Sequence, residues 1–204
     1  MHNAKCTMHN SEPPETVPAR DALPAASCQL PAVVVLGLGN PLRGDDGAGL
    51  KVAEMVEARL RERPVPGVAV RTSTRAGLEV IDLLSGFGRA IVVDCLEVPD
   101  PVPGRVRRLA LDGCPGSARL VGAHDVSLRD AFAFALATGY PMPDEVDVYG
   151  VEAAETLAIT EGLSPAVAAA VEALAEQIHE ELFQRAADHG YPSGQLTADP
   201  NPST

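Results

Sequence analysis

The chain has 204 residues and a formal net charge of −12. This excess of carboxylates disfavours a nucleic-acid partner, because phosphate contacts depend on clustered Lys and Arg side chains. No apolar run reaches the length of a membrane span, and residues 1–30 lack the charged-then-apolar order of a signal peptide. We therefore expect a soluble protein that binds neither nucleic acid nor membranes.

The two ends of the chain differ in composition from its middle. Residues 1–30 are polar, rich in Pro, Ala and Glu, and without helical or strand periodicity, which predicts a disordered N-terminal extension. Residues 190–204 contain several Pro and Gly residues and predict a flexible C-terminal tail. Residues 31–189 then form one domain. The four cysteines show no CxxC pair and no metal-finger spacing, so a reduced, cytoplasmic compartment is the simplest interpretation.

Between the tails, segments with strand and helix patterns alternate. Short apolar runs rich in Val and Ile are typical of buried parallel strands, and apolar residues at helical spacing follow them. In chain order, we expect strands at residues 32–36, 68–72, 90–93, 104–111 and 146–151, and helices at residues 50–60, 78–84, 126–136 and 165–185. The segment 104–111 alternates weakly and fits the sheet edge. This alternation predicts an α/β fold of three layers, α/β/α, with a mostly parallel sheet.

Polar side chains follow two of the predicted buried strands. Asp45 and Asp46 come after a glycine-rich turn that ends the first strand, and Asp94 closes the third strand. The carboxyl ends of parallel strands share one edge of the sheet, where open α/β folds carry their sites. His124 could reach the same edge from its loop. Two carboxylates and an imidazole suit a borderline divalent cation with open coordination positions.

Each of these residues also has a structural alternative. Asp46 could cap the helix that begins near Gly47, Asp94 could hydrogen-bond the following loop, and His124 could be an ordinary loop histidine. Cys95 should point to the face opposite Asp94 and be buried and inert. His179 is expected to be an exposed helix residue.

Several familiar site patterns fail at single positions. The stretch that starts Gly37-Leu38-Gly39 begins like a dinucleotide fingerprint, but Leu42 stands where the third glycine belongs. Anionic phosphates would also meet the two adjacent aspartates there. The segment His179-Glu180 begins like a zinc-protease helix, but Phe183 replaces its second histidine. No Gly-x-Ser-x-Gly elbow is present.

The same residues resemble the hydrogenase maturation endopeptidases, which trim the large subunit of nickel–iron hydrogenases. That family carries Gly-x-Gly-Asn-x-Leu-x-x-Asp-[Asp/Glu]-x-x-Gly after a strand, and the stretch from Gly37 to Gly49 matches it throughout. The resemblance extends over about residues 33–182 and implies three metal ligands, which fall on Asp46, Asp94 and His124. Asp45 is then expected to hold the loop or the helix start.

One loop departs from the family pattern. Many members carry an acidic residue and Gly-Gly-Thr before an Ala-Gly pair, in a loop implicated in substrate choice. This chain has Thr72-Ser73-Thr74-Arg75 before Ala76-Gly77. Thr74 and Arg75 are therefore candidates for contacting the partner, with an ordinary exposed turn as the alternative.

The resemblance implies an endopeptidase that removes the C-terminal extension of a hydrogenase large-subunit precursor after nickel insertion. The nickel would be carried by the precursor and recognised through the three ligands, and the protein would act as a monomer. The catalytic group stays open between Asp46 and Asp94. A non-catalytic, metal-dependent chaperone of the precursor is one alternative. Peptidyl-tRNA hydrolase is another, because its first strand also ends in Gly-Leu-Gly-Asn-Pro, but Arg43 to Asp46 do not fit that family.

Overall fold

The computed structural model describes residues 32–75, 77–111, 127–154, 156 and 159–188. In this part of the chain a five-stranded sheet has the order β2-β1-β3-β5-β4. Strands β1 (Val33–Leu38), β2 (Val68–Ser73), β3 (Arg89–Leu96) and β5 (Glu145–Glu152) are parallel. Strand β4 (Val106–Leu109) pairs antiparallel with β5 at the edge. The predicted mostly parallel α/β fold is confirmed. The predicted tails lie outside the described residues.

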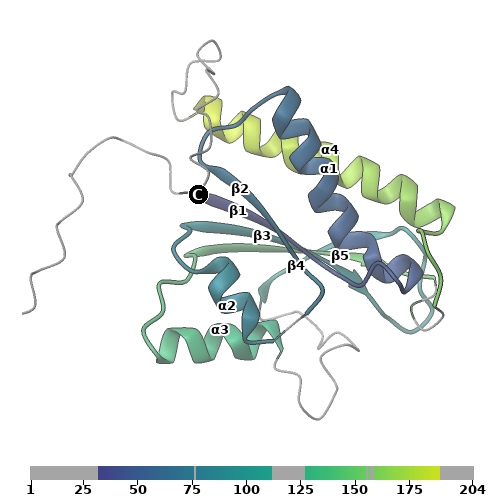
Figure 1. The fold of residues 1–204 in the computed structure, drawn as a ribbon, viewed down its shortest axis with the longest axis horizontal. Helices are drawn as coiled ribbons and strands as arrows, with labels where there is room; N and C mark the ends of the chain where they lie inside the picture. Colours follow the sequence, from purple (N-terminus) through teal and green to yellow (C-terminus); the bar gives the residue numbers. More distant parts are fainter. Residues whose placement is uncertain (1–31, 76, 112–126, 155, 157–158, 189–204) are drawn as a thin grey trace, which may run out of the picture.

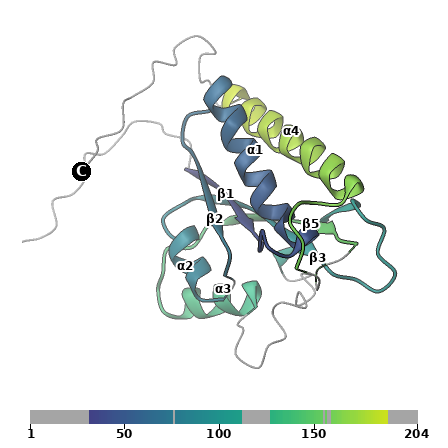
Figure 2. The ribbon, with the colours of Figure 1, turned by 45° about the vertical axis from the view of Figure 1, so that its right-hand side comes forward.

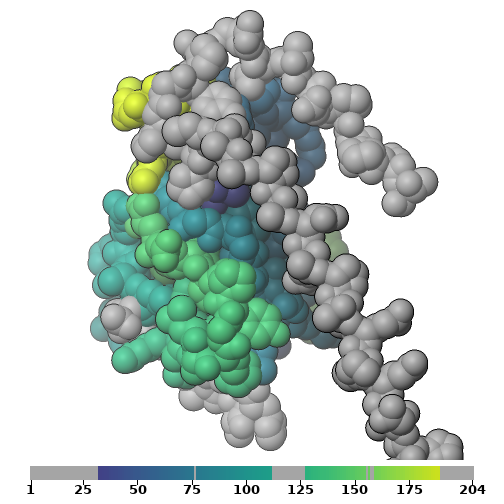
Figure 3. All heavy atoms as spheres, turned by 90° about the vertical axis from the view of Figure 1, so that its left-hand side faces the viewer, coloured from purple at the N-terminus to yellow at the C-terminus, as the bar shows by residue number. Residues whose placement is uncertain are grey.

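Two pairs of helices cover the two faces of the sheet, as Figures 1 and 2 show. Helices α1 (Ala48–Glu62) and α4 (Pro165–Asp188) pack on one face, and α2 (Glu79–Leu84) and α3 (Leu128–Ala137) on the other. Figure 3 shows the molecule from one side, with the end of α4 (yellow) and α3 (green) far apart. The three predicted layers are therefore present.

Buried aliphatic side chains on both sheet faces hold the layers together. Val35 and Ile91 face α1 and α4, whereas Leu36 and Val92 face α2 and α3, and all four are fully buried. Helices cover both faces of the sheet, so side chains on both faces must be apolar. The strands therefore appear in the sequence as continuous apolar runs. No helix in the described part of the chain is long and apolar enough to cross a membrane.

Strand β3 is longer than its apolar run predicts. The sequence indicates a strand that stops before Asp94, but β3 continues to Leu96. The reason is its neighbour, because β5 runs alongside and pairs Asp94 with Gly150 and Cys95 with Val151. Asp94 therefore lies within a paired strand rather than after one.

The prediction for His179 is wrong. This side chain is 6% exposed, and its Nε2 donates to the main-chain oxygen of Arg63 at 2.9 Å. Arg63 follows the end of α1. Its guanidinium lies 3.2 Å from the centroid of the Phe183 ring and pairs with Glu180 at 2.7 Å. Because α4 packs directly on α1, a helix position that looks exposed in the sequence is covered and holds the two helices together.

A buried arginine organises the amino edge of the sheet. Arg89, at the start of β3, is 2% exposed and pairs with Glu145, Asp147 and Glu181. Its Nη2 lies 2.6 Å from Asp147 Oδ2. These ion pairs connect β3, β5 and α4 at the edge opposite the predicted site, and they lower the cost of burying the charge.

Candidate active site at the carboxyl edge of the sheet

The turn after β1 is built around Asn40. Its side-chain Oδ1 accepts from the Leu42 N–H at 3.0 Å, and its main-chain oxygen accepts from the Arg43 N–H at 3.1 Å. The Asn40 N–H donates to the main-chain oxygen of Asp46 at 3.2 Å. These bonds fold the chain back into a short 3₁₀ helix, η1 (Gly44–Gly47), which carries both aspartates.

Helix α1 begins in very close contact with the sheet, and Gly49 permits this contact. A Cβ atom at Gly49 would lie 2.2 Å from the Leu38 oxygen and 2.3 Å from the Val93 oxygen. Both are main-chain atoms of paired strands and have little freedom to move. The last glycine of the motif therefore brings η1 and the start of α1 onto the ends of β1 and β3.

Asp45 holds the loops around the site, as predicted. Its side chain is 2% exposed, and its carboxylate accepts from the Ala154 N–H at 2.9 Å. Its two oxygens also accept from the N–H and the hydroxyl of Ser164, at 2.6 and 3.0 Å. One carboxylate thus joins the turn after β1 to the segments that follow β5 and precede α4, and these hydrogen bonds stabilise its charge.

Asp46 occupies the next position of η1 and is also 2% exposed. The N-cap residue of α1 is Gly47, so Asp46 does not take the capping role considered as its structural alternative. Element η1 packs against β3, the strand that carries Asp94. The structure therefore brings the elements that carry the two predicted carboxylate ligands together.

Asp94 is a half-buried carboxylate whose ionisation is costly. Burial raises the pKa of Asp94 from 3.8 to about 7, the hydrogen bond from the Cys95 N–H opposes this rise, and the charge of Glu97 adds to it. That hydrogen bond is 2.8 Å long. No ion pair to Asp94 is present among the residues that the structure describes.

Cys95 is buried and poorly suited to act as a nucleophile, as expected. Its side chain is 6% exposed. Burial raises the pKa of the Cys95 thiol, and the charges of Asp94, Glu97 and Asp45 raise it further. A thiol in such a place stays protonated and unreactive.

Glu97 and Thr156 also belong to this edge, although no sequence pattern singled them out. The Thr156 hydroxyl donates a hydrogen bond to Glu97 Oε1, and Thr156 is mostly buried. Glu97 lies just after β3, and Thr156 lies in the segment after β5. A carboxylate three positions after Asp94 is the one signal that could have indicated Glu97.

The third predicted ligand, His124, lies outside the described residues. Within the described ranges, no group of three or more His, Cys, Asp or Glu side chains could by itself hold a metal ion. Asp46 and Asp94 carry carboxylates at this edge, and a metal held by these two side chains would need further ligands from elsewhere in the chain or from a partner.

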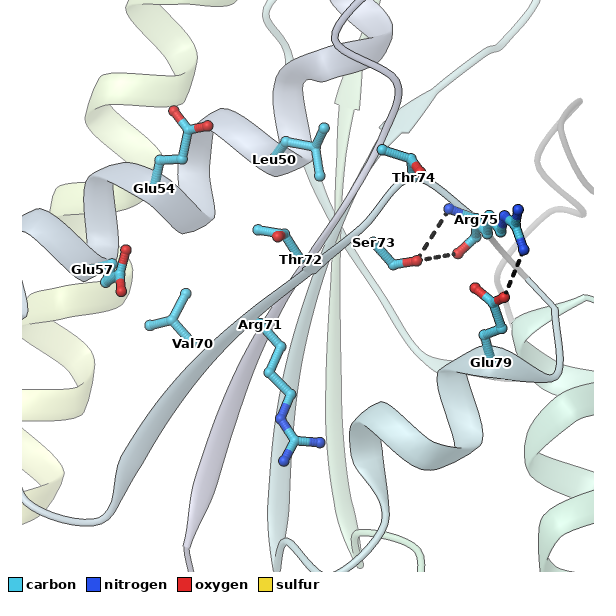
Figure 4. Close-up of a pocket in the computed structure, with 10 residues that line it drawn as sticks. All are labelled: Leu50, Glu54, Glu57, Val70, Arg71, Thr72, Ser73, Thr74, Arg75 and Glu79. Atoms are coloured by element: carbon cyan, nitrogen blue, oxygen red, sulfur yellow. Dashed lines mark hydrogen bonds and ion pairs between the residues drawn. The ribbon is translucent and has the colours of Figure 1, made fainter. Parts of the chain in front are cut away.

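The two residues predicted to contact a partner lie at the end of β2. Thr74 and Arg75 are exposed and line a cavity of about 580 Å³ between β2, α1 and α2 (Figure 4). The Arg75 guanidinium pairs with Glu79 at 3.1 Å.

Comparison with known proteins agrees with this architecture. The family model described as hydrogenase maturation protease matches residues 50–181. The chain is 27% identical over 148 residues to the hydrogenase 2 maturation protease of Escherichia coli, covering 72% of this chain and 87% of that protein. It is 28% identical over 158 residues to the hydrogenase expression/formation protein HoxM of Azotobacter vinelandii, covering 72% and 74%.

Solved structures show the same fold. The hydrogenase maturating endopeptidase HybD from E. coli superimposes with a TM-score of 0.62 at 24% identity, covering 76% of this chain and 93% of that one. The hydrogenase maturation protease HycI from Thermococcus kodakarensis gives a TM-score of 0.53 at 25% identity, covering 74% and 92%. The family match spans more than half of the chain and does not favour the peptidyl-tRNA hydrolase alternative. The chain belongs to the hydrogenase maturation protease family and is an endopeptidase of that family.

Proposed function

We propose that this enzyme removes the C-terminal extension of a nickel–iron hydrogenase large-subunit precursor after nickel has been inserted. In this proposal the nickel belongs to the substrate, and Asp46, Asp94 and His124 recognise it. The two carboxylates lie in elements that pack together at the carboxyl edge of the sheet. A partial ligand set of this kind is completed only when the precursor brings its own metal.

The observation that carries the proposal is the packing of η1, which holds Asp46, against β3, which holds Asp94. The charge balance at Asp94 supports it, because burial and the nearby charge of Glu97 together raise its pKa to about 7. A divalent cation delivered by the precursor would supply the positive charge that favours the ionised carboxylate. Metal recognition and ionisation of Asp94 would then be linked, with a proton released on binding.

The same property bears on the catalytic group, for which Asp46 and Asp94 are the two candidates. In the metal-free enzyme a carboxylate whose pKa is about 7 exchanges a proton with water near neutral pH, but a bound divalent cation lowers that pKa and makes the carboxylate a weaker base. The proposal therefore keeps both Asp46 and Asp94 as candidates for the catalytic group.

The test is cleavage of nickel-loaded precursor by single variants, read as the change in precursor size on a gel. Asp46→Asn, Asp94→Asn and His124→Ala should each leave the precursor at full length. Asp82→Asn is the matched control, because it removes one carboxylate from an exposed position of α2. Nickel-free precursor should stay uncut with every variant.

Two results would count against the proposal. Normal processing by all three variants would remove metal recognition by these residues. Binding of nickel-loaded precursor without release of a peptide, followed by mass spectrometry, would support the chaperone alternative instead. We also propose that the enzyme works as a monomer in the cytoplasm.

A further inference from the structure

Strand β2 is an edge strand with one side open. In the described sheet it pairs with β1 alone. The Val33 N–H donates to the Gly67 oxygen at 2.8 Å, and the Gly39 N–H donates to the Ser73 oxygen at 3.2 Å. Hydrogen bonds of a parallel ladder involve alternate residues, so the odd-numbered residues of β2 bond to β1. The main-chain groups of Val70 and Thr72 therefore point away from the sheet.

A groove runs along this open side. The cavity of about 580 Å³ is walled by α1 through Leu50, Glu54 and Glu57, and it follows β2 from Val70 to Thr74. Figure 4 shows Leu50, Glu54 and Glu57 together on one side of the strand and Arg71 on the other. The groove ends where β2 ends, and Ser73 is paired there with Leu38. An extended chain lying in the groove would thus lead to the carboxyl edge that carries the candidate active site.

The strand carries a charged residue, but that side chain does not cover the edge. Arg71 Nη1 donates to the main-chain oxygens of Asp82 and Leu83, at 3.1 and 2.9 Å. Its guanidinium also lies 4.9 Å from the centroid of the Phe87 ring. In Figure 4 it points away from Glu54 and Glu57. Charged side chains commonly protect edge strands from pairing. Arg71 lines part of the groove, but its guanidinium is held at α2, away from Glu54 and Glu57.

The wall that faces β2 is acidic. Glu54 and Glu57 are exposed, and within the described residues each forms an ion pair only with a neighbour on the same helix, Lys51 or Arg61, at 2.9 Å. Exposed pairs of this kind are weak and exchange easily for another cation. The groove therefore favours an extended segment with a basic side chain directed toward α1.

We propose that the substrate's backbone binds as an added strand on β2, bonding to the main-chain groups of Val70 and Thr72, with a basic side chain facing Glu54 and Glu57. This inference rests on the proposed function, because the segment is the region of the precursor around its cleavage site. Strand addition supplies affinity through main-chain bonds, and side-chain pockets supply selectivity.

A second copy of this chain is a poorer occupant. Two β2 strands related by a two-fold axis would pair the same surface patch with itself. Glu54 and Glu57 of one copy would then face the acidic wall of the other, and like charges in direct opposition are destabilising.

Amide hydrogen exchange tests the proposal without requiring cleavage. The full-length enzyme is saturated with a synthetic, nickel-free peptide that spans the cleavage site of the precursor. Exchange at Val70 and Thr72 should slow about tenfold or more, while Arg71, whose amide already bonds to β1, should change little. Binding without this protection, or no binding, overturns the proposal. Protection that appears on concentrating the enzyme alone assigns the edge to a second copy and also overturns it.

Changes in the peptide and in the enzyme sharpen the test. Two peptides are compared, one methylated on its odd-numbered and one on its even-numbered backbone nitrogens. Only one of these sets carries the N–H groups that bond to β2, so methylation of that set should abolish binding and methylation of the other should leave it unchanged. Glu54→Gln combined with Glu57→Gln should raise the Kd about threefold to tenfold at low salt, and the difference should fade at high salt. Glu176→Gln on α4, exposed and outside the groove, should leave the Kd unchanged.

The outcomes separate this inference from the proposed function. If the enzyme cleaves nickel-loaded precursor but Val70 and Thr72 remain unprotected, the docking inference fails and the proposed function stands. If the two amides are protected but the precursor is never cut, the proposed function fails and the docking site stands.

Discussion

Replacing Asp94 by Asn should stabilise the metal-free enzyme while abolishing its processing of nickel-loaded precursor. Burial raises the pKa of Asp94 from 3.8 to about 7. The unfolded chain therefore releases this proton at lower pH than the folded chain does. Protonated Asp94 makes its full favourable contribution to the free energy of unfolding below pH 4. This contribution is lost as the pH rises to about 7.

The size of the effect follows from the pKa. At about 1.4 kcal/mol per pH unit, a rise from 3.8 to about 7 corresponds to at most about 4 kcal/mol. The carboxylate is only half-buried, so solvent screens part of this energy, and we expect about 2 kcal/mol. Asn fills a similar volume and has no charge to ionise.

Urea unfolding at pH 4 and pH 8, in the presence of a chelator, measures this contribution. The free energy of unfolding of Asp94→Asn should gain about 2 kcal/mol relative to wild type between the two pH values. Asp82→Asn on the exposed side of α2 should show the wild-type pH profile. Parallel profiles for wild type and Asp94→Asn would refute the argument that burial of this carboxylate opposes its ionisation.

Three further substitutions test the packing that positions the site. Gly49→Ala should lower the free energy of unfolding in urea by about 3 kcal/mol or more, because its Cβ would overlap two main-chain oxygens. Gly47→Ala is the control, because a Cβ there meets only ordinary contacts and should be tolerated. Asp45→Ala should cost about 3 kcal/mol by leaving three donors without their acceptor, and proteolysis should then cut the loops after β5 faster. Arg89→Ala should lower the free energy of unfolding by about 1–3 kcal/mol, because Asp147 and Glu181 lose their buried cationic partner and keep only Arg108 and the Tyr149 hydroxyl. The exposed Arg61→Ala should change it by less than about 1 kcal/mol.

Local patterns predicted most of the fold. The apolar runs around Val35 and Ile91 predict buried parallel strands because both sheet faces are covered, and the structure confirms them. The role of Asp45 was expected because the resemblance assigns the second acid of the motif as the ligand, and the hydrogen bonds of its carboxylate confirm that it holds the loops. By contrast, the continuation of β3 past Asp94 depends on pairing with β5, and no local pattern encodes a neighbour that is distant in sequence.

The site itself was predicted only in part. The strand pattern placed Asp46 and Asp94 at one edge, since parallel strands end together. Glu97 and Thr156 escaped prediction because their hydrogen bond joins segments after different strands. His179 was misjudged because its burial depends on the packing of α4 on α1, which helical spacing alone does not specify.

The two ends of α1 are both anchored to their surroundings. At its start Gly49 lies against the main chain of two strands, and at its end Arg63 is held by His179 and Phe183. The helix that faces β2 is therefore held rigidly at a fixed distance from the strand. With its distance from β2 fixed at both ends, α1 would present the proposed substrate strand with a wall whose selectivity depends on the side chains along it. Exchanging Glu54 and Glu57 for other residues should then change which extended segment the groove binds.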